Sequence, residues 1–543
     1  MTVAASSADL CRDVDAGTDF RSDQEDRSME IDLISNLPAR IHGILDEGAK
    51  GDASRIAFTD EHGVDWSYRR VIDTVELAAI EMNRLGIRPG DRVMIVCENS
   101  IAAIVLLYAS SRLDAWAVVT NARLSQHELD LIELDCRPRR VFYTHAISPD
   151  ADAHACRRDA DIEPFTGIGD IKVGKLDADS VAERVHRDSS WQVAVVIYTT
   201  GTTGRPKGVM LSHRSLAFVA CRGKRTDTIR SDDVSLCVMP ISHSYGLTLM
   251  QGMLFAGAHL RIMPRFSLTQ AIDAIVNDTL TIFTAVPALL SRVVAHVDQA
   301  GLQLTPNRLR YVYTGTAPLD LSLRQNVERV FGVVLHNGYG LTETSPTISR
   351  TQYTKGSNEI NIGPPISGVE IKIVGTDGHE VEDGSPGELL VRGPNVMLGY
   401  YGQPELTAGT IDEHGYLKTG DIVSRNTRGE LIVQGRSKEL IIRSGFNVYP
   451  PEIEAVLNTH PTVLNSAVVG RSVKGNEEII AFVEPVPGGS IEANDLFTFL
   501  EGQLARYKKP QQIIVMPQLP VAPNGKIRKH DLKKYAETSA RSV

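Results

Sequence analysis

Apolar runs of strand length alternate with segments of helix length over most of the chain. Strands are predicted from β-branched, apolar composition at residues 92–98, 116–120, 140–144, 193–198, 234–239, 281–286 and 311–314. Ser100 and Ser125 stand where the N-caps of two intervening helices are expected, and Ser212 begins a third. Alternation of this kind indicates mostly parallel sheets covered by helices.

The pattern changes twice towards the C-terminus. After Gly363 the strand-like runs at 369–374, 388–392 and 415–434 are shorter in period and separated by glycines, which predicts an antiparallel or barrel-like subdomain. Beyond Gly435 we expect a strand at 440–443, a helix from Pro450, strands at 466–469 and 479–483, and a helix over 494–507. This part reads as a small α+β domain.

The predicted fold class is therefore α/β. A large N-terminal domain of mixed and parallel sheets with a barrel-like subdomain is followed by a small, mobile α+β domain. We expect a mobile tail at residues 1–30, the large domain at 31–437 and the small domain at 438–543, with a short hinge around residues 436–438.

Composition narrows the function classes. A chain of 543 residues is too long for one hydrophobic core. A net charge of −10 argues against a nucleic-acid partner, which needs a basic face. The longest apolar run, at residues 101–108, is far below the roughly 18–20 residues of a membrane span and predicts a buried helix. The six cysteines are scattered without metal-like spacing, and no secretory signal is expected, so a cytoplasmic location is the expectation.

The strongest chemical signal is YTTGTTGRPKGV at residues 198–209, directly after a predicted buried strand. Its glycines permit a turn whose N–H groups approach a phosphate chain. Further donors for phosphate oxygens are Thr199, Thr200, Thr202, Thr203 and Lys207. The spacing is not that of a Walker A loop.

This loop resembles the phosphate loop of the adenylate-forming superfamily, which includes acyl- and aryl-CoA synthetases, amino-acid adenylation domains and beetle luciferases. Four more segments match family signatures in the family's order: NGYGLTE at 337–343, YLKTGD at 416–421, GRSKELII at 435–442 and PNGKIR at 523–528. The resemblance covers most of the chain. It implies ATP, Mg²⁺ and coenzyme A as cofactors and a site in the cleft between the two domains.

The resemblance also implies residue roles. Thr199, Thr202 and Lys207 would hold the leaving phosphates, Glu343 would bind Mg²⁺, and Thr342 would touch a phosphate oxygen. The ring of Tyr339 would lie on the adenine, whose edge Asn337 would read, and Asp421 would accept the ribose hydroxyls. The complete set implied for ATP or coenzyme A is Thr199, Thr200, Gly201, Thr202, Thr203, Gly204, Lys207, Gly315, Thr316, Ala317, Pro318, Asn337, Gly338, Tyr339, Gly340, Thr342, Asp421, Arg436, Lys438, Ser444, Gly445 and Lys526.

Lys526 would bridge the attacking carboxylate and the α-phosphate. In isolation it belongs to a basic run of the kind that is usually solvated, but the Pro-Asn-Gly turn before it would present it at a tip. By resemblance the small domain swings about Lys438 after adenylation, and Ser444 and Gly445 follow where relatives pass the pantetheine arm.

The segment MPISHSYG at residues 239–246 resembles the family segment that places a histidine, here His243, near the substrate carboxylate. The aspartate that amino-acid adenylation domains use there is absent. The pocket implied by position consists of His243, Tyr245, Leu249, Thr314, Gly338, Gly340 and Pro346. These positions carry no Arg or Lys, so a hydrophobic or aromatic acid is expected and a second carboxylate is not.

The sequence thus predicts an acid–thiol ligase that makes an acyl-adenylate and passes the acyl group to coenzyme A, with Lys526, His243, Thr199 and Glu343 as catalytic residues. Transfer to the phosphopantetheine thiol of a carrier protein is an open alternative, because both acceptors present the same arm. A catalytically inactive nucleotide-binding scaffold and a luciferase-like oxygenase are remote alternatives. The identity of the acid and the oligomeric state are left open.

Overall fold

The computed structural model of the chain describes residues 36–200, 206–277, 279–443, 446–473, 476–522 and 525–539. The predicted tail at 1–30 lies outside this range, and the predicted boundary at Lys438 stays a prediction. All the elements described below belong to one compact unit, Pro38–Val543. Among the described residues, none of the helices combines the length and apolar character that a membrane crossing requires.

One large sheet has the strand order β18-β9-β8-β4-β3-β5-β7-β6, with parallel strands at its centre and antiparallel ones at both edges. Its strands are β3 (Arg92–Cys97), β4 (Trp116–Asn121), β5 (Arg140–Tyr143), β6 (Asp161–Phe165), β7 (Gly169–Val173), β8 (Val193–Thr200), β9 (Pro206–Ser212) and β18 (Gly399–Tyr400).

The second large sheet has the order β15-β14-β13-β12-β10-β11-β1-β2, again parallel except at its two edges. Its strands are β1 (Ile56–Thr59), β2 (Asp65–Ser67), β10 (Val234–Cys237), β11 (His259–Ile262), β12 (Ile282–Thr284), β13 (Tyr311–Gly315), β14 (Leu335–Tyr339) and β15 (Ser349–Arg350). Phe283, Val312 and Phe331 are among the fully buried residues of its core.

The predicted helices form with the expected caps. The side chain of Ser100 accepts from the Ala103 N–H and begins α4 (Ile101–Arg112), whose apolar residues are buried on every side. Ser125 begins α5 (Gln126–Cys136) in a capping box with Glu128. The other helices of this region are α2 (Gly43–Ala49), α3 (Tyr68–Arg84), α6 (Pro149–Arg157), α7 (His213–Ala220), α8 (Arg222–Arg225), α9 (Ser244–Ala256), α10 (Leu268–Val276), α11 (Pro287–Ala300), α12 (Leu321–Phe331), the 3₁₀ turn η1 (Thr342–Thr344) and α13 (Pro404–Thr410).

The segment after Gly363 forms an antiparallel sheet in the order β16-β17-β19-β20. Its strands are β16 (Glu370–Val374), β17 (Gly387–Arg392), β19 (Leu417–Arg425) and β20 (Leu431–Arg436). The sheet continues directly into the predicted hinge, because β20 ends at Arg436.

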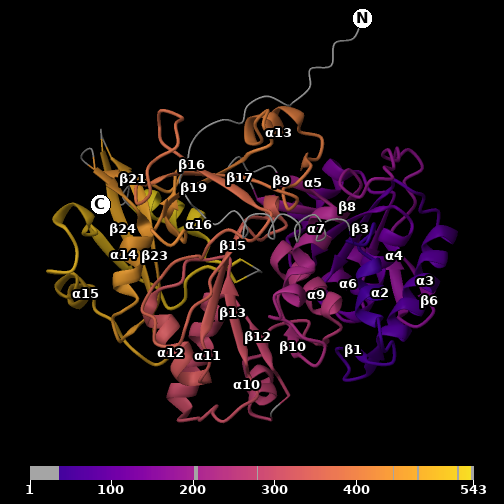
Figure 1. The fold of residues 1–543 in the computed structure, drawn as a ribbon, viewed down its shortest axis with the longest axis horizontal. Coiled ribbons are helices and arrows are strands. Elements are labelled where there is room, and N and C mark those ends of the chain that lie inside the picture. Colours follow the sequence, from indigo (N-terminus) through magenta and orange to yellow (C-terminus); the bar gives the residue numbers. More distant parts are fainter. Residues whose placement is uncertain are drawn as a thin grey trace, which may run out of the picture. The chain divides into compact units, whose positions relative to one another are not determined.

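The small C-terminal region is built on an antiparallel pair extended by a parallel strand, β23-β24-β25, beside the two-stranded β21-β22 (Figure 1). Its elements are β21 (Ile441–Arg443), β22 (Phe446–Val448), α14 (Pro450–Leu457), β23 (Val463–Val473), β24 (Asn476–Pro485), α15 (Ala493–Phe499), η2 (Arg506–Lys508), β25 (Gln512–Val515) and α16 (Lys529–Ser539). The helix expected over 494–507 is wrong in length. The helix α15 ends at Phe499, and Gly502, three residues further on, adopts a left-handed φ of +81°.

The small region contacts the residues that begin the helices α11 and α12 of the large domain. The side-chain amide of Asn458, which follows α14, donates to the Asp320 carboxylate at the start of α12 with an N···O distance of 3.1 Å. A Cβ built on Gly525 would lie 2.7 Å from the Val286 side chain, so the turn before Lys526 packs directly on the start of α11. These contacts place the C-terminal lysine turn beside residues of the large domain.

Candidate active site

The expected phosphate loop joins two antiparallel strands. Thr199 at the end of β8 stands opposite Lys207 of β9, and Thr200 stands opposite Pro206. The predicted contacts Gly201, Thr202, Thr203 and Gly204 lie outside the described residues. Thr199 and Lys207 therefore mark the two sides from which the loop leaves the sheet.

Glu343 lies on the same side of the site as Lys207. The hydroxyl of Tyr400 donates to Glu343 Oε1 at 2.9 Å, and the Lys207 ammonium lies over the Tyr400 ring at 5.3 Å from its centroid. Tyr400 thus fixes the carboxylate with its hydroxyl and contacts the cation with its ring. Tyr400 is buried, and this burial together with the neighbouring Glu343 raises the pKa of its phenol.

The expected nucleotide residues converge on Asp421. Tyr339 donates through its hydroxyl to Asp421 Oδ2 at 2.5 Å, and Arg436 donates through Nε to Asp421 Oδ1 at 2.9 Å. The Asp421 carboxylate is buried, and these bonds use two of its roughly four lone-pair positions. The remaining positions suit the two hydroxyls of a ribose.

Asn337 supplies an unpartnered polar atom beside Tyr339. Its side-chain oxygen Oδ1 is buried and has no hydrogen-bond partner among the described residues. Its backbone N–H is held by the Thr351 hydroxyl at 2.8 Å, which fixes the strand that carries it. A buried acceptor without a partner is costly, so the position fits an amino donor such as that of adenine.

Two glycines of the same motif stand where no side chain would fit. A Cβ on Gly338 would lie 1.6 Å from the Tyr313 hydroxyl, and one on Gly340 would lie 1.5 Å from the Pro346 carbonyl oxygen. The backbone of β14 and η1 is therefore packed tightly between the expected adenine and acyl sites. Tyr313 and Pro346, rather than the glycines themselves, face the acyl side.

The segment Gly315 to Pro318 follows directly on β13. Gly315 is buried, Thr316 adopts a left-handed φ of +72°, and Ala317 and Pro318 continue the turn without regular structure. A β-branched residue is uncommon in this conformation and carries a backbone cost. Thr316, one of the residues expected at the nucleotide, thus lies in a strained backbone conformation.

His243 caps α9 at the entrance to the acyl side. Its Nδ1 accepts from the Tyr245 N–H at 3.3 Å, so the proton of the neutral ring resides on Nε2. Burial, with a smaller effect from Lys526, lowers the pKa of His243 to about 4. The next residue, Ser244, bonds the buried Thr342 hydroxyl at an O···O distance of 3.2 Å.

Backbone hydrogen bonds join Lys526 and Gly525 to Ala522, while residues 523–524 between them lie outside the described residues. The Gly525 N–H donates to the Ala522 carbonyl at 2.8 Å, and the Ala522 N–H donates to the Lys526 carbonyl at 2.7 Å. The pKa of Lys526 is lowered, first by desolvation from the surrounding protein and then by Arg436, against the opposing effects of Glu439 and Asp421. The same ammonium acts on His243. One lysine thus connects the nucleotide side with the acyl side.

Lys438 is exposed in the turn between β20 and β21. On one side of it, the Ser437 N–H donates to the Gly420 carbonyl at 2.9 Å. On the other, Glu439 pairs at 3.3 Å with Lys529, which also pairs with Glu454 at 2.8 Å. Glu439 is therefore tied to the small region and Ser437 to the large one. Ser444 and Gly445 lie outside the described residues.

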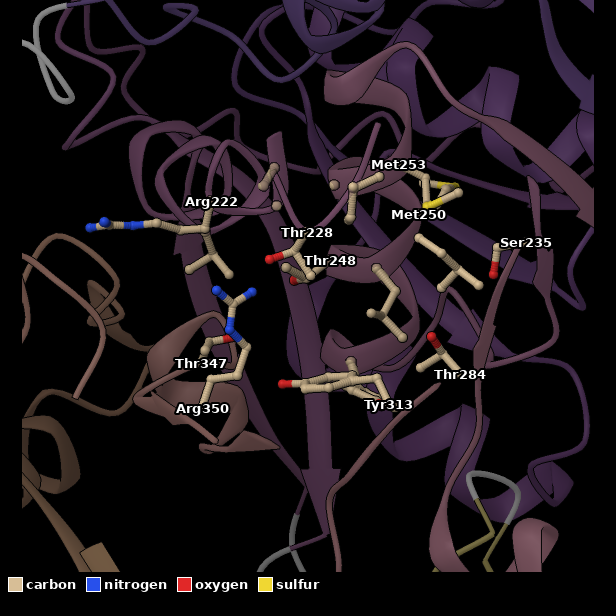
Figure 2. A pocket seen from close by; sticks show the side chains of 18 of the residues that line it. Arg222, Thr228, Ser235, Thr248, Met250, Met253, Thr284, Tyr313, Thr347 and Arg350 are labelled. Carbon is tan, nitrogen blue, oxygen red and sulfur yellow. The ribbon is translucent and has the colours of Figure 1, made fainter. Parts of the chain in front are cut away.

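An apolar cavity of about 270 Å³ lies between α9, β10, β13 and the segment from Pro346 to Arg350 (Figure 2). Tyr245, Leu249 and Pro346 of the expected pocket line it, together with Met239, Met250 and Met253. Thr314, Gly338, Gly340 and His243 are not part of this lining. Two arginines outside the expected set, Arg222 and Arg350, also line the cavity.

Sequence reasoning missed residues that carry no motif of their own. Tyr400, Ser244 and Val286 hold Glu343, Thr342 and the lysine turn in place. Arg350 stands seven residues after Glu343, and a basic residue in this otherwise uncharged stretch was a signal that could have been used.

Together, the parallel sheets, the phosphate-loop motif between the antiparallel strands β8 and β9, and a C-terminal lysine whose pKa is affected by the buried Asp421 define an adenylate-forming enzyme. The comparison with known sequences agrees. The family described as "AMP-binding enzyme" matches residues 45–401, and "AMP-binding enzyme C-terminal domain" matches residues 452–526. The chain belongs to the AMP-binding enzyme family. The expected superfamily, fold class and acid–thiol ligase class are thereby confirmed.

Relatives and solved structures extend over nearly the whole chain. Indoleacetate–CoA ligase of Aromatoleum aromaticum is 33% identical over 490 residues, covering 87% of this chain and 93% of that protein. The 4-coumarate–CoA ligase 1 of Oryza sativa subsp. japonica is 31% identical, covering 85% of each chain. ATP-bound MatB from Rhodopseudomonas palustris superposes with a TM-score of 0.79 at 28% identity, covering 92% of this chain and 99% of that one.

Proposed function

We propose that this enzyme activates a carboxylic acid with a hydrophobic or aromatic body to its acyl-adenylate, using ATP and Mg²⁺, and transfers the acyl group to coenzyme A. The observation that carries the proposal is the position of Lys526. The preceding Gly525 packs on Val286 of the large domain. The charge of Lys526 helps to lower the pKa of His243 beside the acyl cavity, and Asp421 of the nucleotide site opposes the lowering of the Lys526 pKa. The names of the relatives, which are CoA ligases, support the same activity.

In the first half-reaction a carboxylate oxygen attacks the α-phosphorus of ATP, and the bond to the β-phosphate oxygen breaks to release pyrophosphate. Attack by one anion on another needs positioning and positive charge. Lys526 supplies the charge. His243, protonated on Nε2 and neutral at pH 7, supplies a hydrogen-bond donor that orients the carboxylate without adding a charge.

The residues of the leaving-group side fit a magnesium nucleotide. Glu343 is the carboxylate that would bind the ion. The described residues contain no group of three or more metal-ligating side chains. Mg²⁺ is typically held by one or two carboxylates plus substrate phosphates, so a single glutamate is consistent with an ion that binds with ATP. When bound, the ion would neutralise phosphate charge, and Lys207 and Thr199, which stand opposite each other on β9 and β8, would bind the same phosphates.

In the second half-reaction the thiolate sulfur attacks the acyl carbonyl carbon, the thioester bond forms, and AMP leaves with the former carboxylate oxygen. The proposed hinge is Lys438, because the residues on its two sides are tied to different regions: Ser437 to Gly420, and Glu439 to Lys529. Rotation at this position would remove Lys526 and admit the thiol.

The acceptor and the surroundings of the enzyme are further parts of the proposal. Free coenzyme A is favoured over a carrier protein by the relatives' names. A cytoplasmic location is consistent with the described cysteines, which are free thiols and mostly buried. The oligomeric state is open.

Pyrophosphate release tests the proposal directly. The purified protein is assayed with ATP, Mg²⁺ and a panel of fatty, benzoic and cinnamic-type acids, with and without coenzyme A. Acid-dependent release that coenzyme A accelerates is expected. Release that only a phosphopantetheinylated carrier accelerates would identify the alternative acceptor, and the lack of release with every acid would refute the activity.

A further inference from the structure

The acyl cavity has two chemically different ends. Tyr245 and Pro346 tie one end to the nucleotide site: Tyr245 lies within 4 Å of a Cβ built on Gly315, and the Pro346 carbonyl packs on Gly340. The body of the cavity is lined by methionine, leucine and tyrosine side chains. Its volume of about 270 Å³ is near the lower limit of ligand pockets, roughly 300 Å³, and suits a compact acid.

Arg350 brings a charge into this lining. It lies on the edge strand β15 directly opposite Gly338, and its terminal nitrogen donates to the Thr226 hydroxyl at 3.1 Å. The hydroxyl of Tyr311 is close enough for the charge of Arg350 to oppose the rise in the pKa of that phenol that burial causes. In Figure 2 its guanidinium points into the cavity, towards Thr228.

Within the part of the chain that the structure describes, the charge of Arg350 has no opposite charge beside it. Among the described residues, no carboxylate oxygen lies within 4 Å of its guanidinium nitrogens, whereas many other arginines of the chain form such pairs. Its neighbours are the neutral groups of Thr226 and Tyr311. A half-buried guanidinium with neutral partners retains donors that match a planar oxygen group bidentately.

Arg222 provides the contrast. It lines the same cavity, but its side chain points away from the centre in Figure 2 and donates to the Ser367 carbonyl. Its stem also packs over the Phe218 ring, with the guanidinium carbon 4.4 Å from the centroid. Arg222 therefore closes the wall of the cavity, while Arg350 faces its interior.

We propose that the acid substrate carries an oxygen acceptor, either a second carboxylate or a carbonyl, at the end remote from the carboxyl group that is activated, and that Arg350 binds it. This inference rests on the proposed function and names its substrate class more closely. An apolar body would fill the methionine- and tyrosine-lined part of the cavity, and the remote oxygen would meet the guanidinium. Arg350 is then a specificity-determining residue, remote from the reacting atoms.

Matched acids separate this proposal from the bare ligase activity. The probes are 3-phenylpropanoic acids that carry a methyl, an acetyl or a carboxyl group at the para position, and pyrophosphate release gives kcat/KM for each. The wild-type enzyme is expected to prefer the acetyl or carboxyl compound over the methyl compound at least about tenfold, because a site built to bond an oxygen discriminates against an analogue without it.

The variant Arg350→Gln should lose this preference while its kcat/KM for the methyl compound stays within about threefold of wild type. Arg350→Lys should keep part of the preference for the carboxyl compound, since it retains the charge. Arg222→Gln is the control, because it lines the same cavity with its guanidinium turned away, and it should leave the preference unchanged. Thermal unfolding of each variant checks that the fold is kept.

The outcomes distinguish the role of Arg350 from the proposed ligase activity. A preference of the wild type for the methyl compound, or an oxygen preference that persists in both Arg350 variants, would overturn the role of Arg350 and leave the proposed function intact. Absence of release with every acid, by a protein that still binds ATP, would overturn both.

Discussion

The contact between Tyr400 and Glu343 leads to a sharp test of the nucleotide side. Tyr400→Phe removes the hydroxyl that donates to Glu343 Oε1 at 2.9 Å but keeps the ring over which the Lys207 ammonium lies. The substitution therefore isolates one hydrogen bond from the cation–π contact. If this bond holds Glu343 where a magnesium nucleotide needs it, the loss appears in the use of Mg·ATP.

The magnitude follows from the kind of bond. A hydrogen bond to a charged group contributes about 1.5–3 kcal/mol. Because Glu343 is only half-buried, water replaces part of the lost bond, and we expect the lower value of about 1.5 kcal/mol. At about 1.36 kcal/mol per factor of ten, kcat/KM for Mg·ATP in pyrophosphate release should fall about tenfold.

The neighbouring tyrosine supplies a matched control. The Tyr401 hydroxyl also donates to a carboxylate, Glu183 Oε1, at 2.9 Å, and Glu183 is not among the candidate site residues. Tyr401→Phe should leave kcat/KM for Mg·ATP within about twofold of wild type. In a Glu343→Gln background, Tyr400→Phe should add less than about threefold, because its partner is already altered. Equal losses in the two single tyrosine variants would refute the reasoning.

Four further predictions concern the lysine turn, the hinge, the packed backbone and acid stability. Lys526→Ala should reduce adenylation by orders of magnitude but spare thioester formation from supplied acyl-adenylate, and Lys438→Pro should do the reverse; half-reaction rates decide. Gly340→Ala places a Cβ 1.5 Å from a backbone oxygen and should destabilise by about 3 kcal/mol, whereas Gly409→Ala, with open space in a helix, should not, as measured by urea unfolding. The pKa of His243 is about 4 in the folded protein and 6.5 ordinarily, so the unfolded chain takes up the proton first as the pH falls. The free energy of unfolding should therefore decrease as the pH drops from 6.5 towards 4, and it should decrease less steeply in His243→Gln.

Much of the fold follows from local signals that act within a few residues. Ser100, Ser125 and Ser212 accept from backbone N–H groups three positions on and begin helices where the sequence predicts them. Parallel strands read as continuous apolar runs because both faces are buried, as in β3, whose residues are all buried. The helix expected over 494–507 is wrong in length. The helical pattern extends across Gly502, but in the structure Gly502 turns the chain after α15.

The nucleotide side of the site could also be predicted from the sequence, for a different reason. Its residues lie in short segments, and each segment contributes adjacent residues, as Asn337 and Tyr339 do on one strand. The residues that hold these segments in place could not be predicted from the sequence. Tyr400 reaches Glu343 across 57 residues and Val286 receives the turn of Gly525, and neither contact leaves a pattern in the sequence around it.

The acyl cavity shows most clearly where reasoning from one sequence ends. Its lining runs from Val219 to Ser367, and most elements contribute only one or two side chains to it. Whether a side chain faces the cavity depends on packing between elements: Arg222 and Arg350 are the same residue type, yet the first bonds a carbonyl in the wall and the second points inward. A pocket inferred by position from a resemblance finds the wall shared with the nucleotide site, such as Tyr245 and Pro346. It does not reach the remote end, and the remote end is where substrates that share an activated carboxyl group differ from one another.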